Sequence, residues 1–547
     1  MAIEDESTED LTAAAPTPST RDVRILAHGT SLGLVGALTR EGFAALTMFL
    51  LAHLASREQF GIIQWAIACV VLLSVLGKGG FNIVTSRFVA IHAATGEREK
   101  VKGDIYSSLL WTVVSSLSLA LLVTLLAPWL MTALLNKPEF AAPLRAFIWW
   151  VPPTCLVIIA VSCPLAIGSA RPRVAVRDLV VPGTFLIMGS LAALHWQSAV
   201  AVGWAYTLSS LGGLALAFYY LFRFFPALRT TRGVYDHALL FYTSVPLFLT
   251  DLAAMGLAQA DVLVVGRLLP TAQIGVYAAA ARLSLLAAMP LIALNQMTAP
   301  LISRLHHQGK RLELQALLKT FTRLCLTLSL PLSAILVGMA HPVMGLLGKD
   351  FVGGAWALAI ASVGVLVNVA TGSVGLALVM TGYQWLAFLT NLFSVALLVG
   401  MVWWLTPLYG VTGAAVGLAT AVTVANLSRL AIVHRVLRVN PMSLPMLKSV
   451  AAALIATAVA GGLSRALGLT GQEGAAYLAP ILLGLSVLSL AVYLGLVVLL
   501  GIEPSDRQAA QTIIDRLRGR SAAGAGSAAS AESDSEGEED DHSPRAD

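Results

Sequence analysis

Charged side chains are scarce in this sequence. Asp, Glu, Lys and Arg make up 12% of its 547 residues, whereas 57% are hydrophobic and the mean hydropathy is +0.79. Soluble domains hold about a quarter charged residues, so most of this chain must be surrounded by lipid or by its own helices. The composition therefore predicts an all-α integral membrane protein. The net charge of +5 comes from basic loops and predicts no nucleic-acid partner.

Cysteine is rare, and none of the common metal motifs is present. The four cysteines lie within apolar runs and lack the spacing of metal ligands: Cys69, Cys155, Cys163 and Cys325. Cys155 and Cys163 would lie about 12 Å apart along a helix, which is too far for a disulfide. The sequence also lacks an HExxH motif. We therefore expect no metal and no cofactor.

Signatures of ATP-driven pumps and of membrane enzymes are missing as well. No GxxxxGK[ST] motif occurs, and the run from Gly77 to Gly80 around Lys78 has neither its spacing nor its strand–helix context. Membrane polymerases and glycosyltransferases need catalytic groups on sizeable outer loops, and all loops here are short. The chain is therefore predicted not to be an enzyme, and no catalytic residue is assigned. The polar, acidic beginning predicts no cleavable signal peptide.

About fourteen apolar segments are long enough to cross a bilayer. They centre near residues 41, 70, 116, 158, 185, 212, 250, 288, 332, 366, 394, 422, 456 and 488. Residues 1–22 are predicted to be a disordered tail and residues 521–547 an acidic disordered tail. Residues 503–520 are predicted to form an amphipathic helix, either on the inner leaflet or in solvent.

Lysine and arginine gather in alternate loops. The loops after the second, fourth, sixth, eighth and twelfth segments hold Arg98, Lys100, Lys102, Arg171, Arg173, Arg177, Arg223, Arg229, Arg232, Lys310, Arg311, Lys319, Arg435, Arg438 and Lys448. The opposite loops hold one or two each or none, for example Arg57 and Lys137. By the positive-inside rule the basic loops face the cytoplasm, so both termini are predicted to be cytoplasmic. An even number of crossings follows, in agreement with fourteen.

The chain also repeats itself. Four weak matches occur in order at a nearly constant shift, such as Gln59-Phe60-Gly61 with Gln273-Ile274-Gly275, and Gly203-Trp204-Ala205 with Gly413-Ala414-Ala415. A repeat of about six segments returns the chain to the same side of the membrane. We therefore predict two parallel six-helix lobes, residues 23–230 and 231–440, with a cleft between them and an axis along the membrane normal. Residues 441–502 supply two further helices.

Five charged residues are predicted to lie at bilayer depth and to form a substrate site: Arg40, Glu41, Lys78, Asp251 and Arg282. A charge there costs at least about 2.5–3.5 kcal/mol, so each needs a partner or a wet cavity. One interpretation is a cationic cleft that binds an anionic headgroup, since Arg can bind phosphate oxygens in pairs. The other is internal pairing, of Asp251 with Arg282 or of Glu41 with Lys78. Arg40 and Glu41 project about 100° apart on a helix, so we expect that they cannot satisfy each other well and that at least one of them faces the cleft or another helix.

Other charges are predicted to lie near the ends of the helices. Five arginines would mark the inner mouth of a transport path, where they could attract phosphate or only fix the topology: Arg87, Arg171, Arg173, Arg177 and Arg304. Asp261 and Arg267 are expected to make an edge contact at the outer end of the seventh segment.

Several motifs resemble one family. They are SREQFGIIQWA leading to SRFVA, ADVLVVGRLLPTAQIGVYAAAARL leading to APLISRL, LLGKDFVGGAW, and PLYGVTGAAVG. Over about residues 25–440 the chain resembles oligosaccharide-lipid flippases of the polysaccharide transporter branch, within the multidrug/oligosaccharidyl-lipid/polysaccharide exporter superfamily. The related lipid II flippases carry an arginine at the position of Arg282, in a setting similar to Tyr277 to Leu283. They also carry charges in the first helix, which Arg40 and Glu41 resemble loosely.

The resemblance implies a V-shaped pair of lobes that alternates access around a central cavity. Its substrate would be a polyprenyl-diphosphate-linked glycan, moved across the bacterial inner membrane from the inner to the outer leaflet, with the polysaccharide polymerase machinery as a possible neighbour. The alternatives are a cation-coupled multidrug antiporter of the same superfamily and a membrane glycan polymerase or ligase. Ala68 occupies the position in the first repeat that matches Arg282, so the two lobes would be alike in fold but unequal in charge.

Overall fold

Helices make up almost all of the described chain. The computed structural model describes residues 20–500. The predicted acidic tail and the predicted amphipathic helix lie outside these residues. The predicted N-terminal tail lies outside them up to residue 19, and residues 20–22 already belong to the first helix.

Residues 20–224 form nine helices. They are α1 (Thr20–Leu54), α2 (Arg57–Lys78), α3 (Phe81–Ala94), α4 (Arg98–Leu130), α5 (Ala141–Phe147), α6 (Val151–Ala166), α7 (Arg171–Arg173), α8 (Val181–Trp196) and α9 (Ala199–Phe224). Short 3-10 turns lie at Pro138–Phe140, Ile148–Trp150 and Pro226–Arg229, and π-helical turns at Met131–Leu135 and Val174–Val180. The second π-helical turn carries two charged residues, Arg177 and Asp178.

Ten more helices follow. They are α10 (His237–Leu268), α11 (Thr271–Ser284), α12 (Met289–His307), α13 (Arg311–Gly338), α14 (Ala340–Gly345), α15 (Ala355–Thr371), α16 (Val374–Met380), α17 (Gln384–Val436), α18 (Met446–Ala466) and α19 (Ala475–Leu499). The 3-10 turns Leu285–Ala288 and Lys349–Gly354 join their neighbours.

The helix boundaries follow local chemistry. The side chains of Ser56, Ser198 and Asp236 accept hydrogen bonds from the first free N–H groups of α2, α9 and α10, which is the usual role of an N-cap. Gly79 and Gly80 adopt φ of 55° and 79°, which breaks the second segment into α2 and α3. Thirteen stretches within residues 20–500 are long and apolar enough to cross a membrane. The protein is therefore an all-helical, multi-pass membrane protein.

The longest helix, α17, is a hairpin. Its 53 residues would extend about 80 Å if straight, far more than a hydrocarbon core of about 30 Å. Gly410 has φ 61° and ψ −137°, a conformation outside the helix. A Cβ added at Gly417 would lie 2.9 Å from the backbone nitrogen of Val402, so the two legs pack against each other. The legs coincide with the predicted segments centred near 394 and 422. The exact number of crossings stays a prediction.

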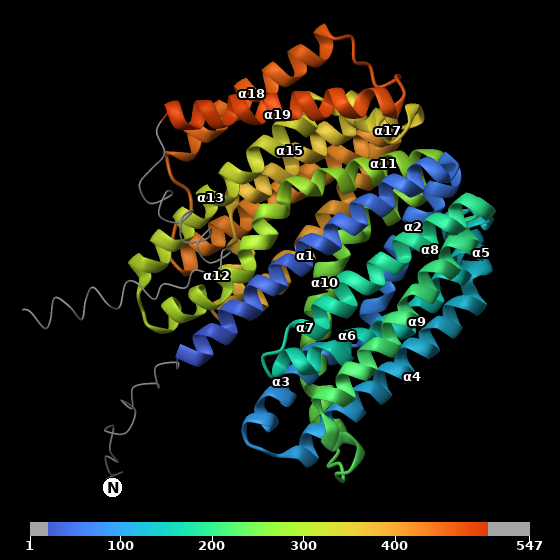
Figure 1. Cartoon of the computed structure of the whole chain (residues 1–547), viewed down its shortest axis with the longest axis vertical. Coiled ribbons are helices and arrows are strands. Elements are labelled where there is room, and N and C mark those ends of the chain that lie inside the picture. The colour runs from blue at the N-terminus through green and yellow to red at the C-terminus, as the bar shows by residue number, and fades with distance from the viewer. Residues whose placement is uncertain (1–19, 501–547) are drawn as a thin grey trace, which may run out of the picture.

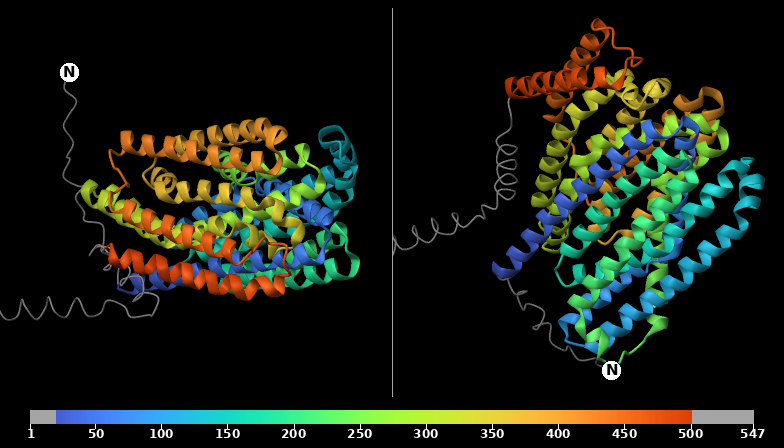
Figure 2. Two further views of the ribbon diagram at one scale, coloured as in Figure 1. Left: turned by 90° about the horizontal axis from the view of Figure 1, so that it is seen from above. Right: turned by 45° about the vertical axis from the view of Figure 1, so that its right-hand side comes forward.

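The two halves of the chain form neighbouring groups of helices (Figure 1). The blue-to-teal group holds α2 to α9, and the yellow-to-orange group holds α13, α15 and α17, with α1 and α10 between them. Helices α18 and α19 pack on α13 at the outer edge of the second group, as both Figure 1 and the right-hand view of Figure 2 show. One large hydrophobic cluster runs from Met48 to Tyr493 and includes side chains of both halves.

The halves meet at equivalent positions of the repeat. Gly61 of α2 and Gly275 of α11 are matched in the repeat, and a Cβ added at either would lie 3.1–3.2 Å from backbone atoms of the other. The same Cβ at Gly61 would lie 2.1 Å from the carbonyl oxygen of Thr271. Equivalent residues of two copies meet where a two-fold axis passes between them, and the predicted duplication would place this contact there. The division into two equivalent lobes stays a prediction.

Candidate functional site

At one end of the molecule, several contacts hold the halves together beside the glycine pair. The ring of Phe60 packs edge-on against Phe351 with 5.4 Å between centroids, and Arg57 lies 3.6 Å from Asp350. Lys137 donates a hydrogen bond to the carbonyl of Leu269. Lys137 lies outside the spanning stretches, and burial lowers the pKa of its ammonium group. This end, the outer one in the predicted topology, is therefore closed.

Deeper in the molecule, an ion pair joins α2 to α10. Lys78 Nζ lies 2.8 Å from Asp251 Oδ2, and the exposed fractions of the two side chains are 8% and 22%. Asp251 therefore bonds to Lys78 and not to Arg282, and Glu41 does not pair with Lys78 as the alternative prediction had it. The helix breaks directly after Lys78, at Gly79, so this cation lies at the bend between α2 and α3.

The first helix carries a second charged cluster, and one prediction about it was wrong. Arg40 Nη2 lies 2.8 Å from Glu41 Oε1, although the two residues are consecutive. Both side chains are long enough to bend around the helix surface, which the direction of their Cβ atoms alone does not reveal. Arg40 Nη1 also lies 3.5 Å from Asp178 Oδ1.

Asp178 is nearly fully buried, at 2% exposure, on the π-helical turn that packs against α1. Gly36 of α1 makes room for it, since a Cβ there would lie 2.8 Å from Asp178 Oδ2. Arg173 lies directly before this π-helical turn, and Arg177 lies on it. Two of the predicted mouth arginines are thus next to the Arg40 cluster, and π-helical turns often occur at functional sites.

Arg282 has a different kind of partner. Its Nη2 donates a hydrogen bond of 2.6 Å to Oε1 of Gln259 on α10, and Gln259 is only 5% exposed. Within residues 20–500 no carboxylate lies within ion-pair distance of Arg282, and its side chain is half-buried. The bond orients the guanidinium but does not neutralise its charge. Gln259 was not among the predicted residues, although a lone amide in the apolar run LAQADV is the signal that would have singled it out.

The expected edge contact of Asp261 with Arg267 is also wrong. Asp261 is 5% exposed and accepts a 2.9 Å hydrogen bond from the hydroxyl of Tyr277. Arg267 instead donates to the carbonyl of Leu135, at 3.1 Å. The aspartate points into the contact between α10 and α11, whereas the arginine reaches the first half of the chain.

Two further arginines lie within spanning helices, and neither was among the predicted site residues. Arg429 donates to Asn391 Oδ1 at 2.7 Å and lies 3.5 Å from Asn426 Oδ1 and from Ser394 Oγ, all on the α17 hairpin. Arg323 on α13 is 6% exposed and also interacts with neighbouring groups. A charge inside an apolar run was the available signal for both.

The remaining mouth arginines do not gather at one point. Arg87 on α3 and Arg304 on α12 are exposed and belong to different halves of the chain. Figure 1 and the right-hand view of Figure 2 draw α3 and α12 on opposite sides of the first part of α1. Arg171 is exposed at the start of the short α7.

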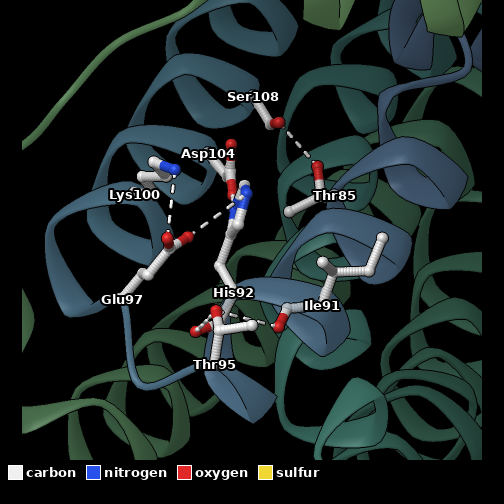
Figure 3. Close-up of polar contacts among 8 residues, drawn as sticks. All are labelled: Thr85, Ile91, His92, Thr95, Glu97, Lys100, Asp104 and Ser108. Atoms are coloured by element: carbon white, nitrogen blue, oxygen red, sulfur yellow. Dashed lines mark hydrogen bonds and ion pairs between the residues drawn. The ribbon is translucent and has the colours of Figure 1, made fainter.

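A polar cluster fixes the turn between α3 and α4 (Figure 3). His92 Nδ1 lies 2.7 Å from Asp104 Oδ2, and Lys100 Nζ lies 3.1 Å from Glu97 Oε1. On the same helix, Lys102 donates to the carbonyl of Thr231 at 2.7 Å. This hairpin therefore holds the segment that links the two halves of the chain.

The predicted site residues thus include cations from both halves: Arg40 with carboxylates, Lys78 with a carboxylate from the other half, and Arg282 with an amide. Such groups can bind an anion through charge-assisted hydrogen bonds. Within residues 20–500 no three His, Cys, Asp or Glu side chains are close enough to hold a metal ion.

Solved structures with the same fold are transporters. The lipid II flippase MurJ in an inward closed conformation matches with a TM-score of 0.65 and 14% identity, over 84% of this chain and 97% of MurJ. A mutant of the Vibrio cholerae MATE transporter VcmN matches with a TM-score of 0.56 and 16% identity, over 76% and 97% of the two chains. An inward-facing multidrug resistance MATE transporter of the MOP superfamily matches with a TM-score of 0.52 and 15% identity, over 76% of this chain and 94% of that transporter.

Sequence comparison gives the family. No curated protein matches the chain. The model of the family described as "Polysaccharide biosynthesis protein" matches residues 26–306, which is more than half of the chain. This match confirms the predicted relation to polysaccharide biosynthesis proteins, and the chain shares its fold with the transporters named above. This chain belongs to the polysaccharide biosynthesis protein family.

Proposed function

We propose that the protein is a flippase that moves a polyprenyl-diphosphate-linked oligosaccharide across the bacterial inner membrane, for the assembly of a surface polysaccharide such as O-antigen, exopolysaccharide or capsule. The diphosphate binds the cations between the two halves, the sugars occupy a wet cavity, and the polyprenyl chain stays in lipid. The family and the fold shared with a lipid flippase support this proposal. Energy comes from an ion gradient or the membrane potential.

The observation that carries the proposal is the state of Arg282. Among the three proposed site cations, Lys78 and Arg40 already face carboxylates, whereas Arg282 hydrogen-bonds the amide of Gln259 and forms no ion pair within residues 20–500. A guanidinium at bilayer depth without a carboxylate in direct contact is costly unless an anion or water reaches it. A diphosphate supplies that anion, and the planar guanidinium can bind two of its oxygens at once.

During transport the two halves rock against each other, so that the closed end opens while the opposite end closes around α1. Opening the closed end requires loss of the contacts around Gly61 and Phe60. The Lys78–Asp251 pair lies between these ends, so a diphosphate that binds Lys78 competes with Asp251 for it. Substrate binding would thereby loosen a bond between the halves, which couples binding to movement.

Arg282→Gln tests the proposal. The glutamine keeps polar contact with Gln259 but removes the charge, so transport should fall at least about tenfold, the equivalent of about 1.4 kcal/mol. Arg282→Lys should retain part of the activity. The measurement is the protection of a fluorescent polyprenyl-diphosphate sugar from an added quencher, in vesicles containing the purified protein. Arg465→Gln, an exposed change on α18, is the matched control and should be neutral. Equal rates for Arg282→Gln and the control would disprove the assignment.

A second candidate is a cation-coupled multidrug antiporter, favoured by the similarity of the fold to MATE transporters. Removing a central positive charge should not weaken the binding of an organic cation and could strengthen it. The same vesicles therefore separate the two functions. Efflux of an organic cation that survives Arg282→Gln, with no movement of the lipid analogue, would favour the antiporter.

A further inference from the structure

Exposed basic residues gather at one end of the second half of the chain. We call the following set the basic face: Arg304, Lys310, Arg311, Arg435 and Arg438. One hydrophobic cluster beneath them joins the ends of α12, α13 and α17, for example through Ile302, Leu314 and Val433. Arg311 also donates a 2.7 Å hydrogen bond to the carbonyl of Arg438. The basic face is therefore a single surface.

Most of its charge is not neutralised by the protein. Lys310 lies 3.0 Å from Glu313, but within residues 20–500 none of the other four members has a carboxylate within ion-pair distance. Arg304 and Lys310 also line a cavity of about 280 Å³ between α12 and α13. Fixed positive charges this close together repel one another, so an acidic partner would be bound favourably.

The chain leaves the described structure close to the segment that follows this surface. Lys448, ten residues after Arg438 of the basic face, donates a 3.0 Å hydrogen bond to the carbonyl oxygen of Leu500. The end of α19 is therefore tied to the start of α18, the next helix after the basic face along the chain.

The following segment is strongly acidic. Residues 532–547 contain eight Asp and Glu residues and one arginine, which gives a net charge of −7. A random coil of the length that separates residues 500 and 532 would have a root-mean-square length of about 30 Å. Tethering of this kind produces an effective concentration in the millimolar range. The acidic segment is thus within reach of the basic face and present there at high local concentration.

We propose that the acidic segment 532–547 binds the basic face of its own chain. Single exposed ion pairs contribute only about 0.2–1 kcal/mol, but several formed together with a tethered partner give a stable contact. The bound segment covers Arg304 and the α12–α13 cavity, and so it excludes other anions from them. Anionic lipid headgroups and the anionic part of a lipid-linked substrate belong to the anions that it would exclude.

Distances between spin labels test this contact in the full chain. One label replaces Ser535 in the acidic segment and the other replaces Gln308, which lines the cavity, with Cys69 changed to Ala. Control pairs join Ser535 with Thr95, in the α3–α4 turn, or with Gln472, between α18 and α19. The protein is studied in nanodiscs of phosphatidylcholine alone and with phosphatidylglycerol. A second variant carries amides in place of the seven carboxylates of residues 532–541.

We expect a short, narrow distance distribution for the Gln308 pair only. It should broaden to that of a free tail in the amide variant, and in 1 M salt, where the screening length is about 3 Å. If the amide variant keeps the short distance, charge does not hold the segment and the proposal is overturned. The proposal is also overturned if the Thr95 pair is equally short. If phosphatidylglycerol abolishes the short distance, lipid covers the basic face instead of the tail.

Discussion

At the scale of single residues, the Lys78–Asp251 pair makes a clear prediction. Loss of one partner leaves an uncompensated charge in a poorly hydrated place, which costs about 3–5 kcal/mol in buried pairs. Asp251→Asn should therefore lower the melting temperature of the purified protein markedly. Replacing both residues by apolar ones, Lys78→Met with Asp251→Leu, should recover most of that stability. The measurement is thermal unfolding in detergent.

The exposed pair Lys310–Glu313 provides the control for this comparison. Its side chains are 50% and 57% exposed, and such pairs contribute about 0–1 kcal/mol. Glu313→Gln should leave the melting temperature nearly unchanged. A double variant as unstable as Asp251→Asn would show that the charge pair is not the source of the effect.

Residue-scale features of the site could be predicted only in part. The sequence identifies charges at membrane depth, because an apolar run interrupted by Arg, Lys or Asp is visible along the chain. Their partners depend on which helices pack together, and so Asp251 was matched with Arg282 and not with Lys78. The amide partner Gln259 carries no charge, so the search for charges at membrane depth did not predict it.

At the scale of elements, the turn of the α17 hairpin depends on one glycine. Gly410 has a positive φ that other residues adopt only at a cost of about 1–3 kcal/mol. Gly410→Ala should therefore lower the melting temperature. Gly400→Ala, within the first leg, should be neutral or should stabilise the protein by about 0.5–1 kcal/mol. In both positions an added Cβ meets nothing within 4 Å, so the two variants differ in backbone conformation and not in packing. Equal melting temperatures would contradict this explanation.

Helix positions were predictable because hydrophobic length is a local property of the sequence. Segments centred near 250 and 332 correspond to α10 and α13, for instance. The interruptions were not predictable to the same degree. Gly372, between α15 and α16, has φ 72° and lies against Thr322 of α13, so that break depends on a neighbouring helix. The 3-10 turn Leu285–Ala288 has no glycine or proline of its own to announce it.

For the whole molecule, the duplication was the most informative feature of the sequence. It matched Gly61 to Gly275 from sequence alone, and these two residues touch where the halves meet. The extent to which each half moves as a unit was not predictable, because α10 contacts helices of both halves. Its first part packs on α3, its middle packs on α17 at Gly256, and its end packs on α2 at Gly266.

This contact between the glycines leads to a prediction about the closed end of the molecule. A methyl group at Gly61 would lie 2.1 Å from the carbonyl oxygen of Thr271, whereas unstrained contacts are near 3.5 Å. Gly61→Ala should therefore separate α2 from α11 by about 1 Å or more and favour opening of this end. Spin labels in place of the exposed Glu58 and Lys349 measure that opening as a longer distance. Gly212→Ala on α9, where an added Cβ meets nothing within 4 Å, should leave the distance unchanged. If both variants give the distance of the unmodified protein, then the glycine contact does not limit how closely the halves approach, and closure must depend on neighbouring contacts such as Phe60 with Phe351.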